Sequence, residues 1–186
     1  ALLLAQSRND SKAIRLLIDY GADIEETVKN RETVLRARAL RTSWANVAVW
    51  VIDNFHTSHG KLIEKIISLN FNGSVYTYDI AGGGVSGAIE YIVEWALSHP
   101  DTLIVVNMSW GNDHFDSREN DLFGSLADNM GFVFVAAAGN DGRPTCSYPA
   151  GYKGVIGVST VYWMQERQEY VLSPYGNYGG WVILAA

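Results

Sequence analysis

The sequence predicts an α/β fold, a parallel sheet in three layers (α/β/α), preceded by an α-helical segment. Apolar runs that read as strands begin at four positions about 28 residues apart, near Val47, Val75, Leu103 and Phe132. Helical patterns separate these runs, and two further apolar runs follow at 155–158 and 181–185. Strand–helix–strand units of this length are typical of right-handed crossovers between parallel strands.

The three helical stretches between the runs carry apolar side chains at positions i, i+1, i+4 and i+5. This spacing is typical of a helix that packs on a sheet, so we expect each stripe to face the strands. The stripes are Leu62, Ile63, Ile66 and Ile67; Ala88, Ile89, Ile92, Val93 and Ala96; and Leu122, Phe123, Leu126, Ala127 and Met130.

The composition limits the classes of function. A chain of 186 residues has room for one good domain and part of another. Its net charge of −6 argues against a nucleic-acid partner. The apolar runs fall far short of the ~20 residues that a membrane-spanning helix needs, so no membrane contact is expected. The one cysteine, Cys146, excludes an internal disulfide and leans towards a reducing, intracellular compartment, although a buried, inert thiol is the simplest interpretation of it.

Residues 1–43 have a different pattern and form a separate predicted unit. An apolar stripe there ends at Tyr20-Gly21, where glycine suits a left-handed helix cap. The segment LAQSRNDSKAIRLLIDYGAD resembles an ankyrin repeat, and NRETVLRARA resembles the opening of a second one. The resemblance implies a protein-binding module, with further repeats before Ala1; a generic helical hairpin is the alternative. We therefore divide the chain into an ankyrin-like segment, 1–43, and an α/β domain, 44–186.

An acid and an imidazole lie at one predicted edge of the sheet. Asp53 closes the first strand, and His59 opens the first helix six residues later. A buried carboxylate beside an imidazole fixes its tautomer and stabilises its protonated form, as a general base requires. Taken alone, an Asp–His pair in a turn is also a common incidental arrangement. We expect the neighbouring Ser58 to cap the helix.

Two small-residue motifs follow the third and fourth strands at the same edge. They are NMSWG (Asn107–Gly111) and AAAGNDG (Ala136–Gly142). Small residues permit close backbone approach, and the amide of Asn140 is suited to stabilise negative charge as an oxyanion-hole donor. An asparagine before a turn also has a purely structural explanation.

Taken together, these motifs resemble the subtilisin-like serine proteases (subtilases, peptidase S8) from Val47 to the last residue. VIDNF, SHGKLIEKIISLN, NMSWG, AAAGNDG, YPAGYKGVIGVSTV and SPYGNYGGWVILAA carry the resemblance. It implies that Asp53 orients His59, that His59 takes the proton of a serine, and that Asn140 binds the oxyanion. It also implies a polypeptide substrate, extended between two segments. These segments are Gly82, Gly83 and Gly84 on one side and Ser109, Trp110 and Gly111 on the other.

The chain departs from the family pattern at several positions. Its loop between Asp53 and His59 is shorter, and Lys61 and Leu62 replace the Thr-His that usually follows the His-Gly of the family. Trp110 stands where the family usually has leucine, and it either lines a side-chain pocket or packs. No serine matches the nucleophile, whose segment would follow Ala186. We therefore expect an inactive fragment of a serine endopeptidase; the alternative is a non-catalytic scaffold that recruits a protein through its ankyrin segment.

The sequence also suggests two other kinds of site. Gly82, Gly84 and Gly87 have the G-x-G-x-x-G spacing of a dinucleotide-binding loop, but Asn107 stands where such a site needs an acid. His114 with Asp113 and Asp116 suggests either a metal site or a solvated polar loop. No cofactor is identifiable; the family resemblance alone raises calcium, without a loop of suitable ligand spacing.

Overall fold

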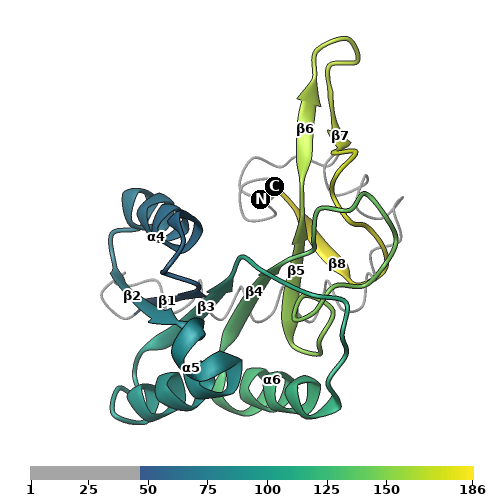
Figure 1. The fold of residues 1–186 in the computed structure, drawn as a ribbon. Coiled ribbons are helices and arrows are strands. Elements are labelled where there is room, and N and C mark those ends of the chain that lie inside the picture. Colours follow the sequence, from purple (N-terminus) through teal and green to yellow (C-terminus); the bar gives the residue numbers. More distant parts are fainter. Residues whose placement is uncertain (1–46) are drawn as a thin grey trace.

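A six-stranded parallel sheet lies at the centre of the computed structural model, which describes residues 47–186 (Figure 1). The predicted ankyrin-like segment, 1–43, lies outside the described residues. The strand order is β2-β1-β3-β4-β5-β8. The strands are β1 (Val47–Asp53), β2 (Ser74–Asp79), β3 (Leu103–Met108), β4 (Val133–Ala137), β5 (Val155–Ser159) and β8 (Val182–Ala185). The predicted parallel sheet is confirmed.

The burial of β1 explains its unbroken apolar sequence. All seven of its residues are buried, because strands flank it on both sides and both faces of the sheet are covered there. From β1 the chain crosses to β2 on one side and then to β3 on the other. The carboxyl ends of β1 and β3 therefore meet at a topological switch point, where open α/β sheets bind their ligands.

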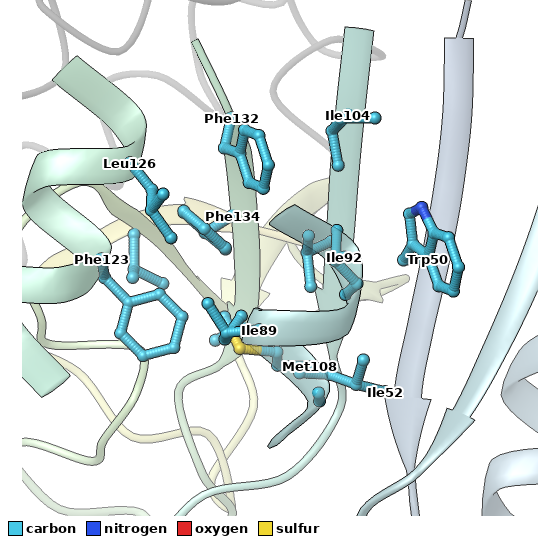
Figure 2. Packing of buried hydrophobic residues seen from close by; sticks show 14 of the residues in the cluster. Trp50, Ile52, Ile89, Ile92, Ile104, Met108, Phe123, Leu126, Phe132 and Phe134 are labelled. Atoms are coloured by element: carbon cyan, nitrogen blue, oxygen red, sulfur yellow. The ribbon is translucent and has the colours of Figure 1, made fainter. Parts of the chain in front are cut away.

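Helices cover both faces of this sheet, as the three-layer prediction requires (Figure 1). α5 (Ile80–Leu97) and α6 (Ser117–Met130) lie on one face, and α4 (Ser58–Asn70) lies on the other, against β1 and β2. The main core lies between the sheet and the pair α5–α6 (Figure 2). Phe123 of α6 meets Phe134 of β4 edge-to-face at 4.8 Å. Each fully buried side chain of this kind stabilises the fold by roughly 1.5–3 kcal/mol.

The helix α6 has well-defined ends. The Asp116 side chain accepts a hydrogen bond from the Arg118 amide at 2.8 Å, and Gly131 ends the helix in the left-handed conformation. The same carboxylate lies 3.0 Å from the Arg118 guanidinium. That hydrogen-bonded guanidinium, with the amide bond, lowers the pKa of Asp116 to about 2.

α4 lies on the sheet as predicted, but only half of its apolar stripe is covered, because Ile63 and Ile67 are half-buried and the other two residues are not. The side chains of Leu62 and Ile66 are 55% and 48% exposed, and Gly60 is the one buried residue of this helix. The physical reason is position, since α4 lies over β1 and the edge strand β2, where the sheet is too narrow to cover the whole stripe. The stripe of α5 is buried as expected. In α6 the buried side chains of the stripe are Phe123 and Leu126, which pack in the main core.

One element was not predicted. The strands β6 (Val161–Met164) and β7 (Glu169–Leu172) form an antiparallel hairpin that projects from the sheet (Figure 1). Trp163 and Tyr170 face each other across it, with ring centroids 5.1 Å apart. The hairpin lies between β5 and β8 in the sequence and leaves their parallel pairing in place.

Candidate active site

Asp53 and His59 lie in direct contact at the carboxyl edge of β1. The Nδ1 atom of His59 is 3.1 Å from Oδ2 and 3.2 Å from Oδ1 of Asp53. The Asp53 side chain is 5% exposed, whereas that of His59 is 52% exposed. A ring that donates from Nδ1 to this buried carboxylate keeps Nε2 as a basic nitrogen. The pair therefore has the geometry of an oriented general base.

The short loop between the two residues is held by its own hydrogen bonds. The backbone amide of Asn54 donates to Asp53 Oδ1 at 2.7 Å, and the hydroxyl of Thr57 donates to the carbonyl of Asn54 at 2.8 Å. Thr57 also caps α4, because its Oγ1 accepts from the His59 amide at 3.3 Å. The expectation that Ser58 caps this helix is wrong by one residue; Ser58 is the first residue of the helix itself.

A second carboxylate, Asp79, connects this loop to the next helix. Its Oδ1 accepts from the amide of Ala81 at 3.0 Å, which caps α5, and its Oδ2 lies 3.3 Å from Nε2 of His56. The amide of Phe55 donates to Asp79 at 3.4 Å. Asp79 therefore braces the loop that leads to His59 against the start of α5.

The backbone at Gly82, Gly83 and Gly84 differs from the loop or extended segment that the sequence suggested. Gly82 and Gly83 lie in a helical turn, and Gly84, with φ 66° and ψ −172°, breaks this turn from the rest of α5. The reason is the Asp79 cap, which starts the helix directly after β2. A dinucleotide site would need a loop between strand and helix, and this arrangement does not provide it.

The segment after β3 reaches back to β1. The indole Nε1 of Trp110 donates to the carbonyl of Ile52 at 2.8 Å, next to Asp53. Trp110 also packs against the main core and lines a cavity. The sequence left open which of these two roles it has, and in the structure it has both. Ser109 and Gly111 line the same cavity.

This cavity, of about 330 Å³, lies between the segments that follow β3 and β4. Asn140 lines it with an exposed side chain, and no hydrogen bond to another residue of 47–186 holds its amide. The cavity is lined by Ser109, Trp110, Gly111, Asn112, Asp113, Ala137, Gly139, Asn140, Asp141, Arg143, Thr145, Cys146, Ser147 and Asn177. Gly82, Gly83 and Gly84 are not part of this lining.

The cavity also contains the one cysteine of the chain. Cys146 is half-buried, and burial raises the pKa of its thiol. Burial likewise raises the pKa of the neighbouring Tyr148. The thiol is therefore protonated and poorly nucleophilic near neutral pH.

The other suggested sites take ordinary structural roles. Asp116 caps α6, and the backbone amide of His114 donates to Asn112. Within residues 47–186 no group of three or more His, Cys, Asp or Glu side chains could hold a metal ion.

The same residues include no helix long and apolar enough to cross a bilayer. Among them, no serine hydroxyl is hydrogen-bonded to the His59 ring.

Comparison with known proteins decides the family. The model of the subtilase family (peptidase S8) matches residues 47–185, most of the chain and nearly all of its described part. The chain belongs to the subtilase family. This subtilase is 42% identical over 125 residues to a thermophilic serine proteinase from Bacillus sp. strain AK1, covering 67% of this chain and 27% of that protein. It is 36% identical over 148 residues to halolysin from Haloferax mediterranei, covering 78% of this chain and 25% of that protein.

Two further comparisons agree. A thermostable alkaline protease from Halalkalibacterium halodurans is 35% identical over 103 residues, covering 55% of this chain and 27% of that protein. The crystal structure of the subtilisin-like protease Apa1 from Pseudoalteromonas sp. AS-11 matches this subtilase with a TM-score of 0.54 at 20% identity, covering 77% of this chain and 42% of that one. That likeness supports the fold. The subtilase chain spans about a quarter of the length of the curated relatives it matches.

Sequence reasoning gave no role in this site to several residues that line the cavity, among them the buried Asn177. Asn177 lines the cavity although it lies 37 residues after Asn140, in the segment between β7 and β8. It is 2% exposed, and the family resemblance assigns it no role. A polar residue between glycines in SPYGNYGG indicates a turn, and nothing in that pattern specifies its partner.

Proposed function

We propose that the full-length protein is a serine endopeptidase of the subtilisin type that cleaves polypeptides. The observation that carries this proposal is the hydrogen bond between His59 and the buried Asp53, at the switch point of a subtilase sheet. Family membership supports the reaction class, and the geometry supports the roles of the residues. The nucleophile would be a serine from a segment that follows Ala186.

In this mechanism Nε2 of His59 removes the proton from the serine hydroxyl as the oxygen attacks the carbonyl carbon of the scissile bond. Asp53 stabilises the resulting imidazolium through Nδ1, and the imidazolium then gives its proton to the leaving amine. The free amide of Asn140 donates to the oxygen that becomes negatively charged. Loss of such a donor typically costs about 10²–10³ in kcat; this magnitude was measured on subtilisin, a member of the same family.

In this proposal the cavity that Asn140 lines takes part of the substrate. A side chain of the substrate next to the scissile bond would enter the space between Ser109–Gly111 and Asn140, with Trp110 as one wall. The substrate backbone would run along Ser109, Trp110 and Gly111 on one side and Gly82, Gly83 and Gly84 on the other, held by main-chain hydrogen bonds. Because Gly82 and Gly83 are helical here, the second segment would need to extend when a substrate binds.

The test is hydrolysis of an unfolded protein, such as reduced and alkylated casein, by the full-length protein and its His59→Ala variant. We expect the wild type to cleave casein and the variant to lose this cleavage by a factor on the order of 10³ or more. A folded wild type without cleavage would contradict the proposal and favour the non-catalytic scaffold.

A further inference from the structure

The buried Asn177 makes an unusual number of hydrogen bonds to one short turn. Its Oδ1 accepts from the amides of Asp141 at 2.8 Å and Arg143 at 3.4 Å. Its Nδ2 donates to the Asp141 carboxylate at 3.4 Å, and its backbone amide donates to the carbonyl of Gly139 at 3.1 Å. One residue thus holds both sides of the turn at 139–143, and Asn140 lies inside this turn.

Asn177 is itself fixed to the sheet. The hydroxyl of Ser159, at the carboxyl end of β5, donates to the carbonyl of Asn177 at 2.6 Å. Both residues are buried, and a buried hydrogen bond is costly to break because its partners cannot turn to water. The contacts form a chain from β5 through Asn177 to the turn.

Asn140 depends on this chain because its own side chain has no partner among residues 47–186. The position of its amide is therefore set by the backbone of the turn. Gly139 has a φ of 102°, and a Cβ added to it would lie 2.5 Å from Nδ2 of Asn177. Glycine at 139 thus lets the turn approach Asn177 closely, and Asn177 holds the turn in this conformation.

We propose that Asn177 is a positioning residue that fixes the Asn140 amide for the developing oxyanion. This inference rests on the proposed function and adds a residue to which the family resemblance assigns no role. Placement matters because a donor that must reorganise during the reaction loses much of its effect, and a misplacement of about 1 Å can cost about 10²-fold. The expected signature is a lower kcat with little change in KM.

The experiment uses the full-length protein and a peptide amide with alanine before the scissile bond, so that filling of the cavity contributes little. Asn177→Ala should lower kcat by about 10-fold to about 10²-fold and change KM by less than about threefold. Asn129→Ala, an exposed asparagine on α6, is the matched control and should keep the wild-type kcat.

A double-mutant cycle with Asn140→Ala separates positioning from general damage. If Asn177 acts through Asn140, then Asn177→Ala should lower kcat by less than about threefold in the Asn140→Ala background. An undiminished loss in that background would overturn the inference. Ser159→Ala, which removes the anchor but leaves Asn177, serves if Asn177→Ala does not fold; it should show a smaller loss of kcat that also disappears without the Asn140 amide.

The outcomes distinguish the two proposals. An inactive wild type overturns the proposed function, and this inference with it. An active wild type whose Asn177→Ala and Ser159→Ala variants keep the full kcat overturns only the inference.

Discussion

The His59 ring meets the Asp53 carboxylate across five intervening residues, with Nδ1 of the ring 3.1 Å from Oδ2. The acid is buried beneath the sheet edge, and half of the imidazole side chain remains exposed. The two nitrogens of the ring are therefore in different environments, one fixed by the protein and the other open to a reactant. This asymmetry leads to the first prediction.

Replacement of Asp53 by asparagine should lower kcat of the full-length protein by about 10⁴-fold, with KM nearly unchanged. The amide keeps the shape of the carboxylate but permits the wrong tautomer of His59 and no longer stabilises the imidazolium. Steady-state kinetics on a peptide amide measure the effect. Asp101→Asn, in the loop at the opposite edge of the sheet, is the control and should match the wild type. A loss below about tenfold in Asp53→Asn would rule out this role.

The hydrogen bond from Trp110 to Ile52 should contribute measurably to stability. Trp110→Phe removes the indole N–H that the Ile52 carbonyl accepts at 2.8 Å and keeps most of the aromatic surface. We expect the free energy of unfolding to fall by about 1 kcal/mol, measured by urea denaturation. Trp163→Phe, on the half-exposed β6–β7 hairpin, should have a smaller effect. Equal losses in the two variants would show that the bond does not stabilise the fold.

Two glycine substitutions should have different effects on the free energy of unfolding. Gly139→Ala combines a φ of 102° with a Cβ that would lie 2.5 Å from Nδ2 of Asn177, so it should destabilise the fold by more than about 1 kcal/mol. In Gly82→Ala the new Cβ meets no atom within 4 Å, and alanine favours the helical turn there. We therefore expect Gly82→Ala to be neutral or to stabilise the fold by up to about 1 kcal/mol. Thermal unfolding compares the two, and a destabilised Gly82→Ala would contradict the helical turn.

The ion pair of Asp116 with Arg118 predicts that the stability of the fold depends on pH in the acid range. The folded-state pKa of Asp116 is about 2, below its unfolded value, because the Arg118 guanidinium and amide stabilise the carboxylate. Its contribution to stability is therefore complete above about pH 4 and is lost as pH falls towards 2. Asp116→Asn keeps a capping side chain but loses the charge, so the stability gap to the wild type should close over this range.

Chemical denaturation between pH 2 and pH 6 measures that gap. Arg118→Gln removes the other partner of the pair and is the matched variant; its gap to the wild type should narrow over the same range. A gap that stays constant with pH would show that the ion pair contributes nothing.

The parallel sheet and the Asp53–His59 contact were both predictable from sequence. Apolar runs at a regular interval fix the succession of strands and helices, and a residue at the end of each strand must then lie at one edge. Local spacing was enough for Asp53 and His59, which are six residues apart. The exposed half of the α4 stripe was not predictable, because periodicity shows which face of a helix is apolar and does not show how much sheet lies beneath it.

Asn177 illustrates why part of the site could not be predicted. Its hydrogen bond to Asp141 spans 36 residues, and the contact depends on how the β6–β7 hairpin and the following loop return to the sheet. That hairpin was itself missed, since its two short strands have no regular interval with the others. The helix cap at Thr57 was missed by one residue because Thr57 and Ser58 are both good capping residues.

The most direct measurement is labelling of the folded, full-length protein with a fluorophosphonate, followed by mass-spectrometric identification of the modified residue. The account predicts one modified serine, in the segment that follows Ala186, with labelling abolished in His59→Ala because the ring then takes no proton from the hydroxyl. Absence of label in folded wild-type protein, or labelling that persists without His59, would contradict it.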